Sequence, residues 1–323
     1  MHIVQILPMY HPDGEELLNR LAYVTKFEQF DESKIIRFLN NHVVDGIILR
    51  APAKITPAIL DACQHVKAIS GAGVGLDNID VDYATRKGIP VLHAPKINSQ
   101  ATAEHAISLI LATMKNIVTF HKETKKGNYD YRDGKFTIEL KDKKLGLIGF
   151  GSIAQKVAKI MRYGFEMDVL AYVRNNHLER QKIADSIDVN LTTSMEQVFR
   201  ECDVISLHIP LTDETKELID SDFFNLMKPN AVLINTARGG IVHEKDLVDA
   251  LKNRKFLRAG VDVFSNEPPS SSHPFFEVEQ IIVTPHIGGI SQEAAKATSE
   301  IIVKNLIKAI DGEDMHTIAN RQR

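Results

Sequence analysis

Short apolar runs alternate with more polar stretches through the first part of the chain. The runs have strand length and occupy residues 2–7, 23–27, 46–50, 66–70 and 90–93. The stretches between them are predicted as helices over residues 14–21, 31–40, 56–64 and 81–87. Strands that alternate with helices are typical of parallel βαβ units, so residues 1–97 are predicted to form a small doubly wound domain.

A second series of strands follows a long helix, which is predicted over residues 98–121. After a polar, turn-rich segment at 127–135, strands are predicted at 144–148, 168–173, 204–209, 231–235, 259–264 and 281–284, with a helix at 244–252. A last helix over residues 291–311 begins after Ser291 and ends before Gly312. It follows the last strand of the second series, so the chain is expected to cross between domains near residues 98 and 289.

The length of 323 residues exceeds what one ordinary core holds. Together with the two crossings, it predicts an α/β protein with two doubly wound parallel-sheet domains. One domain comprises residues 1–97 plus 290–323, and the other comprises residues 98–289.

The second series opens on a glycine turn between a strand and a helix. Gly149, Gly151 and Ala154 form a G-x-G-x-x-A pattern, preceded by an apolar run and followed by apolar residues at helical spacing. The first glycine allows a tight turn, the second lets a pyrophosphate approach the backbone, and the small alanine lets the helix pack on the strand. The N-terminus of that helix then faces the phosphates, so the pattern predicts dinucleotide binding.

Composition and charge narrow the classes of function. A net charge of −3 provides no basic field, which argues against nucleic acid as a partner. Cys63 and Cys202 lie far apart in apolar surroundings, so both are predicted to be buried free thiols. The N-terminus lacks a basic stretch, its apolar run breaks at Pro8, and no run reaches membrane-spanning length. We therefore predict a cytoplasmic protein with no membrane partner.

Three chemically useful side chains follow successive strands of the second series. Arg238, Glu267 and His286 come after the predicted strands at 231–235, 259–264 and 281–284. Ligands of open parallel sheets bind beyond the carboxyl ends of the strands. Each residue alone has an ordinary explanation as a surface or loop charge, but together they are expected to meet at the dinucleotide crevice.

This set suits hydride transfer to a 2-keto acid. The guanidinium of Arg238 can hold a carboxylate in two hydrogen bonds. His286 can give a proton to the carbonyl oxygen, and Glu267 can fix the imidazole tautomer and favour its protonated form. Because a nicotinamide supplies the hydride, the residues alone predict a nicotinamide enzyme that acts on a small 2-keto or 2-hydroxy acid.

At this point the sequence resembles the D-isomer-specific 2-hydroxyacid dehydrogenase family. The matching segments are GVGLDNID (73–80), NS and AEH within 98–105, the glycine turn, SLHIPL (206–211), NTARGG (235–240), GVDVF (260–264) and PHIGG (285–289). The resemblance implies a flavodoxin-like substrate domain, a Rossmann cofactor domain and a homodimer joined through the cofactor domains. It also implies that Arg238, Glu267 and His286 are catalytic.

The resemblance extends to binding residues. It implies that the backbone at Val74 and Gly75 binds the substrate carboxylate together with Arg238. In the phosphoglycerate dehydrogenase branch, a stretch similar to that at Arg50 helps to bind the substrate phosphate, so Arg50 is a candidate substrate ligand. The residues implied to line the cofactor site are Thr102, Gly149, Gly151, Ser152, Ile153, His208, Pro210, Thr215, Thr236 and Asp262, with Asp262 near the nicotinamide amide and His208 at the adenine side. His105, on the predicted long helix, is interpreted as structural.

One position departs from the usual NAD-binding pattern. The second strand of a dinucleotide fold usually ends in an acid that bonds the ribose 2′-hydroxyl. Here Val173 stands at that place and Arg174 follows it. Because an arginine accommodates a 2′-phosphate, both NAD(H) and NADP(H) remain candidates and NADP(H) is favoured, with Arg174 as a cofactor-binding residue.

The leading hypothesis is an NAD(P)-dependent 2-ketoacid reductase of the glyoxylate or hydroxypyruvate type. A 3-phosphoglycerate dehydrogenase is the alternative within the class, because the branches share most motifs. A cofactor-sensing binding protein of the corepressor type is the alternative from another class, since such proteins can keep the same three residues. Formate dehydrogenase is a relative, but that branch carries an amide where Glu267 stands.

Overall fold

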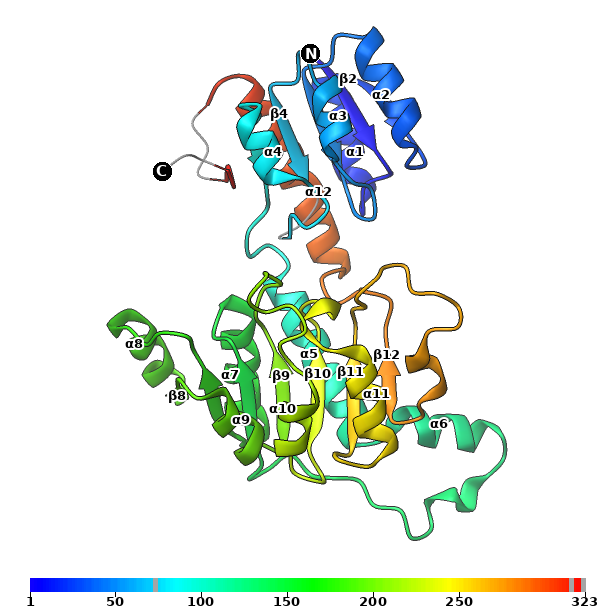
Figure 1. The fold of residues 1–323 in the computed structure, drawn as a ribbon, viewed down its shortest axis with the longest axis vertical. Helices are drawn as coiled ribbons and strands as arrows, with labels where there is room; N and C mark the ends of the chain where they lie inside the picture. The colour runs from blue at the N-terminus through cyan, green and yellow to red at the C-terminus, as the bar shows by residue number, and fades with distance from the viewer. Residues whose placement is uncertain (72–74, 314–316, 321–323) are drawn as a thin grey trace. The chain divides into compact units, whose positions relative to one another are not determined.

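The computed structural model describes residues 1–71, 75–313 and 317–320, which fall into two compact units. One unit comprises residues 1–98 and 290–323, and the other comprises residues 99–289 (Figure 1). Both contain a parallel sheet with helices packed on it, so the predicted α/β fold with two doubly wound domains is confirmed. None of the helices in the described part of the chain is long and apolar enough to cross a membrane.

The smaller unit has a five-stranded parallel sheet in the order β2-β1-β3-β4-β5. Its strands are β1 (His2–Ile6), β2 (Tyr23–Phe27), β3 (Gly46–Leu49), β4 (Ala68–Gly71) and β5 (Val91–Leu92). This order is that of flavodoxin-like folds. The central strands are buried on both faces, which explains why they are nearly continuous apolar runs in the sequence.

Helices from both ends of the chain cover the sheet of the smaller unit. They are α1 (Pro12–Leu21), α2 (Glu32–Asn41), α3 (Pro57–Ala62), α4 (Val81–Arg86) and α12 (Gln292–Ile310). The apolar side of α12 packs with Ile3 and Ile48, and its Ile302 carbonyl accepts a hydrogen bond of 3.0 Å from the Ser70 hydroxyl. The C-terminal helix therefore belongs to the smaller unit.

The larger unit has a seven-stranded parallel sheet in the order β12-β11-β10-β9-β6-β7-β8. Its strands are β6 (Lys144–Ile148), β7 (Asp168–Tyr172), β8 (Asn190–Thr192), β9 (Val204–Leu207), β10 (Val232–Asn235), β11 (Arg258–Val261) and β12 (Ile281–Val283). The direction of winding reverses between β6 and β9, which are paired neighbours. Such a reversal leaves a crevice at the carboxyl ends of these two strands, where open α/β sheets bind their ligands.

Two apolar layers cover the seven-stranded sheet. Successive residues of β10 point to opposite layers, so that Val232 and Ile234 join one and Leu233 joins the other. The first layer is formed with α5 (Ser99–Met114) and α7 (Ser152–Phe165), and the second with α9 (Met195–Glu201), α10 (Ser221–Leu226) and α11 (Glu244–Lys252). The remaining elements are α6 (Ile117–Lys125), α8 (Leu178–Ser186) and the 3₁₀ helices η1 (Tyr129–Arg132), η2 (Gly239–Ile241) and η3 (Pro274–Glu277).

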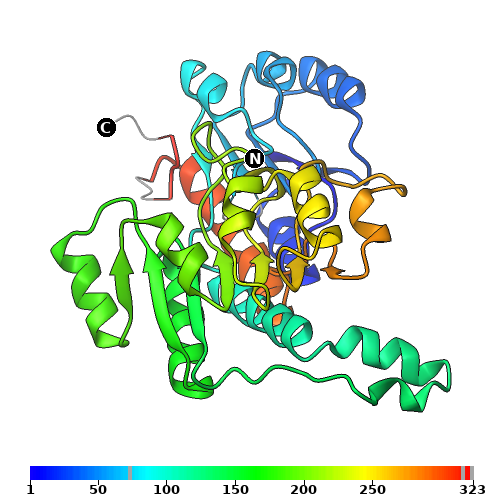
Figure 2. The same ribbon diagram turned by 60° about the horizontal axis from the view of Figure 1, so that its bottom comes forward.

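The prediction of one long helix over residues 98–121 is wrong. The chain forms α5 and α6 instead, separated by a turn at Asn116 with φ of 52° and ψ of 34°. Asparagine tolerates this left-handed conformation better than most residues, and it cannot continue a right-handed helix. In consequence α6 and η1 extend away from the sheet as an arm (Figures 1 and 2).

Both cysteines are free, but only one is fully buried. Cys202 lies in the core of the larger unit, whereas Cys63 is partly exposed because it is the residue after the end of α3. Its thiol donates to the Ile59 carbonyl at 3.2 Å. Burial raises the pKa of both thiols to about 12, so neither is a reactive thiolate at neutral pH.

Candidate active site

The glycine turn lies between β6 and α7, at the reversal point of the larger sheet. Gly149 has φ of 101°, and a Cβ there would lie 2.6 Å from the carbonyl oxygen of His208. A residue with a Cβ would be strained at this φ and would also clash with the His208 carbonyl, so this position requires glycine. At Gly151, by contrast, a Cβ would meet nothing within 4 Å in the part of the chain that the structure describes, so the backbone is open to a ligand.

Polar groups at this turn fit the phosphates of a dinucleotide. Gly151 is the residue immediately before α7, and no described side chain caps the free N–H groups of the first turn of this helix. Thr236, which follows β10, has a buried hydroxyl without a hydrogen-bond partner among the described residues. The Ser152 hydroxyl lies 3.1 Å from that of Ser99, at the start of α5. Donors grouped at a helix N-terminus suit an anion, so the residues present fit the cofactor that the motif implies.

Other predicted cofactor residues flank the turn. Thr102 is buried in α5, Ile153 packs against the α5–α7 layer, and Pro210 is exposed after β9. The Thr215 hydroxyl donates to the Pro210 carbonyl at 2.7 Å, and thus holds the loop in which Pro210 lies. Desolvation lowers the pKa of His208 to about 4, so this imidazole is neutral at physiological pH and hydrogen-bonds to the Ser206 hydroxyl.

Arg174 lies just past β7, beside the buried Val173. Its guanidinium forms an ion pair of 2.9 Å with Glu214, and the two side chains are 68% and 73% exposed. An ion pair this exposed contributes at most about 1 kcal/mol. The guanidinium is consequently held only weakly and can exchange Glu214 for another anion.

Arg238 is presented by the tight turn after β10. The buried Asn235 side chain fixes this turn, because its amide donates to the Arg238 carbonyl and accepts from the Ala237 N–H, each at 3.0 Å. The Arg238 guanidinium in turn donates to the Ala237 carbonyl at 2.7 Å. Asn235 was not among the candidates from the sequence, although a polar residue ending an otherwise apolar strand is a usable signal.

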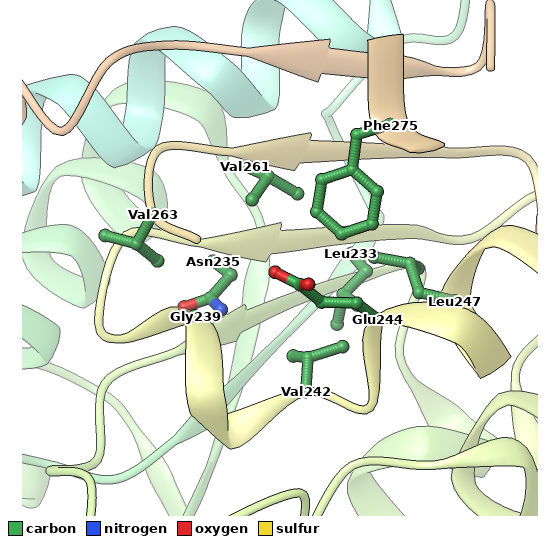
Figure 3. A pocket seen from close by; sticks show the side chains of 9 residues that line it. All are labelled: Leu233, Asn235, Gly239, Val242, Glu244, Leu247, Val261, Val263 and Phe275. Carbon is green, nitrogen blue, oxygen red and sulfur yellow. The ribbon is translucent and has the colours of Figure 1, made fainter. Parts of the chain in front are cut away.

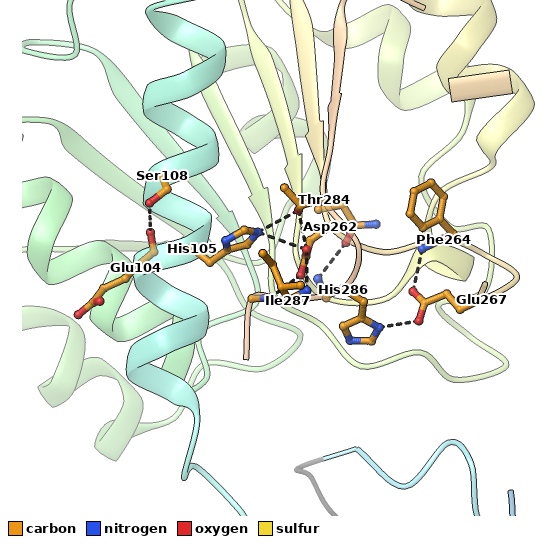
Figure 4. A network of polar contacts seen from close by, with 12 residues as sticks. Glu104, His105, Ser108, Asp262, Phe264, Glu267, Thr284, His286 and Ile287 are labelled. Atoms are coloured by element: carbon orange, nitrogen blue, oxygen red, sulfur yellow. Dashed lines mark hydrogen bonds and ion pairs between the residues drawn. The ribbon is translucent and has the colours of Figure 1, made fainter. Parts of the chain in front are cut away.

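Glu267 and His286 form a short polar contact (Figure 4). The Nδ1 atom of His286 lies 2.6 Å from Oε2 of Glu267. The other carboxylate oxygen of Glu267 accepts the backbone N–H of Phe264 at 3.0 Å. Because both carboxylate oxygens are engaged, the acid holds one orientation toward the ring. The opposite ring nitrogen, Nε2, is left to point away from Glu267.

The backbone at His286 is in the left-handed region, with φ of 53°. Such a conformation costs about 1–3 kcal/mol and persists where its surroundings impose it. Here the Asp262 carboxylate, 1% exposed, accepts the N–H groups of Ile287 and Gly288 at 3.0 and 2.8 Å, and the Asp262 carbonyl accepts that of His286 at 2.8 Å. Asp262 follows β11 and therefore fastens the loop after β12 to the neighbouring strand.

His105 and Thr284 complete the surroundings of Asp262 (Figure 4). The Thr284 hydroxyl donates to the carboxylate at 2.5 Å, and His105 Nε2 lies 3.2 Å from the same oxygen. The interpretation of His105 as structural agrees with this contact, because the ring faces Asp262 from α5. The contact of His105 could not be read from spacing, since α5 and the residue after β11 are far apart in the chain.

Charge in the site favours an ionic His286–Glu267 pair. The hydrogen bond that His286 donates to Glu267 raises the pKa of His286, against desolvation and the nearby charge of Arg238. Desolvation of Glu267 is outweighed by its hydrogen bonds with His286 and Phe264 and by the charge of Arg238, and its pKa is lowered. Desolvation of Asp262 is likewise outweighed, by four hydrogen bonds, and its pKa is lowered. The site thus combines the cation of Arg238 with the imidazole of His286, which retains its proton more readily than usual.

The predicted substrate ligands Arg50 and Gly75 belong to the smaller unit, and Val74 lies outside the described residues. Arg50 follows β3, with its guanidinium over the Tyr10 ring at 5.2 Å. It donates to the carbonyls of Pro8 and Ala51. The cation is therefore held in place beside the carboxyl end of the smaller sheet.

Comparisons with known proteins agree with this architecture. Residues 107–288 match the model of the NAD-binding domain of D-isomer specific 2-hydroxyacid dehydrogenases. The chain is 34% identical to a D-3-phosphoglycerate dehydrogenase of Methanocaldococcus jannaschii, over 96% of this chain and 58% of that protein. It is 35% identical to a glyoxylate reductase of Pyrococcus furiosus, over 86% of this chain and 83% of that protein.

A solved structure extends the likeness to the whole fold. The NADPH-dependent glyoxylate/hydroxypyruvate reductase of Sinorhizobium meliloti, in complex with NADP and malonate, is 25% identical and has a TM-score of 0.86, covering 100% of this chain and 98% of that one. The chain spans only about half to three fifths of the length of the D-3-phosphoglycerate dehydrogenases of Methanocaldococcus jannaschii and Archaeoglobus fulgidus. The matched domain, the sheet order and these relatives together establish that the chain belongs to the D-isomer specific 2-hydroxyacid dehydrogenase family.

Proposed function

We propose that the chain is an NAD(P)-dependent reductase of small 2-keto acids, of the glyoxylate or hydroxypyruvate type. The observation that carries this proposal is the 2.6 Å contact between His286 and Glu267, within the field of Arg238, at the carboxyl edge of a sheet with an open glycine turn. A proton donor beside a carboxylate-binding cation is what reduction of a 2-keto acid requires. The names of relatives such as the Pyrococcus furiosus glyoxylate reductase support the same substrate class.

In this proposal each side chain has one role. Arg238 holds the substrate carboxylate in paired hydrogen bonds, and His286 gives its Nε2 proton to the carbonyl oxygen as that oxygen gains charge. Glu267 keeps Nδ1 protonated and the ring oriented, while the Phe264 N–H fixes Glu267. When bound, the reduced nicotinamide supplies the hydride. Arg50, Val74 and Gly75 are proposed to contact the substrate from the smaller domain, residues 1–97 plus 290–323.

For the cofactor, we propose NADP(H) in preference to NAD(H). Support comes from Val173 and Arg174 at the place where an acid would repel a 2′-phosphate. The weak ion pair between Arg174 and Glu214 leaves the guanidinium available to a phosphate. The Sinorhizobium meliloti reductase, by its description NADPH-dependent, supports the same preference.

We also propose a homodimer assembled through the arm formed by α6 and η1. Among the described residues of α6 and η1 none is buried, and the apolar side chains of Ile117, Tyr129 and Phe136 are exposed along the arm, Phe136 by 91%. Contiguous exposed apolar patches mark protein interfaces, and we propose that these three side chains belong to such a patch. Sedimentation should give a dimer for the wild type and a smaller species for Phe136→Glu, and a monomeric wild type would overturn this assembly.

The test of the activity is a panel assay on the wild-type protein. Oxidation of NADH and of NADPH is followed with glyoxylate, hydroxypyruvate, phosphohydroxypyruvate and pyruvate. The proposal expects the highest kcat/KM for glyoxylate or hydroxypyruvate with NADPH. A preference for phosphohydroxypyruvate would favour a 3-phosphoglycerate dehydrogenase, in which Arg50 would hold the phosphate. Tight cofactor binding with no turnover of any acid would favour a cofactor-sensing binding protein.

A further inference from the structure

A second carboxylate–histidine pair, Glu244 and His273, is connected to Glu267 through the backbone at Phe264 and Ser265. Glu244 is the first residue of α11 and lines a small void with Gly239 and Phe275 (Figure 3). Its Oε1 accepts the backbone N–H of Ser265 at 2.8 Å, and its Oε2 lies 3.2 Å from Nε2 of His273. Neither residue was a candidate from the sequence, and neither has a role in the proposed proton transfer.

The tautomer of His273 follows from its other contact. Its Nδ1 accepts the backbone N–H of Phe275 at 3.3 Å, so the ring proton lies on Nε2 and points to Glu244. The ring also packs edge-on against Phe264, with centroids 5.2 Å apart. Glu244 therefore receives two donors, one from the loop that begins after β11 and one from the segment that returns to β12.

The peptide between Phe264 and Ser265 links this pair to Glu267. The Phe264 N–H donates to Glu267, and the next N–H along the chain, that of Ser265, donates to Glu244. The same peptide lies against the turn that carries Arg238, because a Cβ on Gly239 would be only 1.9 Å from the carbonyl carbon of Phe264. A shift of this peptide would consequently move Glu267 relative to both His286 and Arg238.

We propose that Glu244, supported by His273, is a positioning residue that fixes the Glu267 carboxylate against His286. This inference rests on the proposed function only for its effect on rate, since the geometry is a property of the free protein. A carboxylate suits the task because both of its oxygens accept and neither donates. A glutamine would satisfy one of the two donors and turn its own N–H groups toward the other, which would push the Ser265 peptide away.

The experiment compares Glu244→Gln and Glu244→Ala with Asp246→Asn as a matched control. Asp246 is also in the first turn of α11 and also accepts a backbone N–H, but that of Ser221, the first residue of α10, at 3.0 Å. Its side chain is 26% exposed, against 23% for Glu244. Loss of charge, helix stabilisation and burial are thus closely matched between the two sites.

Two readouts are used, and one of them is independent of turnover. In the free proteins, the titration of His286 is followed by NMR of the ring resonances, assigned with His286→Asn. Besides Glu267, the charges that act on this ring are those of Arg238 and Asp262, and none of the variants changes them. The Glu244 variants should titrate at lower pH than the wild type, because a displaced Glu267 stabilises the imidazolium less.

The second readout is the pH profile of kcat for reduction. Misplacement of a reacting group by about 1 Å can cost about 10²-fold, so the Glu244 variants should lose about 10–100-fold in kcat, with the alkaline decline moved to lower pH. In a Glu267→Gln background, the further change Glu244→Gln should cost almost nothing, because the carboxylate that it positions is absent.

These outcomes separate the inference from the proposed function. Wild-type titration and kcat in both Glu244 variants, or an equal loss in Asp246→Asn, would overturn the positioning role. A loss of thermal stability with an unchanged His286 titration would overturn it too, since it would show a structural role only. A wild type that reduces no 2-keto acid would refute the function, while the NMR titration would still decide the position of Glu267.

Discussion

The buried carboxylate of Asp262 gives the sharpest prediction about the site. In Asp262→Asn one oxygen remains an acceptor, and the other becomes an amide nitrogen that faces a donor. The oxygen lost is expected to be the one that accepts the Gly288 N–H at 2.8 Å, since the other oxygen takes three of the four contacts. The replacement also turns the remaining charge-assisted hydrogen bonds into neutral ones.

The magnitude can be built from these contacts. A buried donor left without a partner costs about 1–3 kcal/mol, and the change from a charged to a neutral acceptor costs about 1 kcal/mol more for each retained bond. The loop can relax and recover part of these summed costs. Asp262→Asn should therefore lower the free energy of unfolding by about 3 kcal/mol. For a unit of this size, about 3 kcal/mol corresponds to a fall in Tm of about 6–12 °C.

The pH dependence of stability provides an independent check that the charged form of Asp262 stabilises the fold. Because hydrogen bonds outweigh desolvation, the pKa of Asp262 is lowered in the folded state. A lowered pKa contributes stability that is complete above the unfolded value of about 3.9 and is lost as pH falls through the folded value. Calorimetry of wild type and Asp262→Asn should therefore show the largest difference in Tm at neutral pH and a smaller one in acid. Equal Tm values at neutral pH, or a difference that grows in acid, would refute the assignment.

Further substitutions test the roles proposed for individual side chains. Glu267→Gln should move the alkaline decline of kcat to lower pH, because the His286 pKa loses its main support; an unmoved decline would contradict the pairing. Arg238→Lys should raise KM for every 2-keto acid by about 10-fold or more, through loss of the paired hydrogen bonds, and unchanged KM values would exclude this contact. Arg174→Ala should raise KM for NADPH and leave that for NADH within about twofold, whereas equal effects on both cofactors would exclude a 2′-phosphate role.

The strands were predictable because the sheets are buried on both faces. Gly46–Leu49 is apolar throughout, and Lys144–Ile148 is apolar after its first residue, as expected for strands that are buried on both faces of a parallel sheet. β8 escaped prediction because this short edge strand is polar and half exposed. The break between α5 and α6 escaped because the apolar spacing continues across Asn116, while the conformation of that one residue ends the helix.

The site was predictable only as far as topology determines it. Carboxyl ends of parallel strands share one edge, which is sufficient to bring the segments of Arg238 and His286 together. The loop after β11 has no periodicity, so the contacts of Glu267 with Phe264 and of Glu244 with Ser265 follow from the folded backbone alone. The same holds for the contact of His105 with Asp262, which joins elements more than a hundred residues apart in sequence.

The most direct test of the central claim is the kcat of His286→Asn for reduction of hydroxypyruvate by NADPH, with cofactor affinity measured on the same samples. If the imidazole delivers the proton, kcat should fall by about 10²–10⁴-fold while the Kd for NADPH stays within about twofold of the wild type. A kcat equal to that of the wild type would contradict the account.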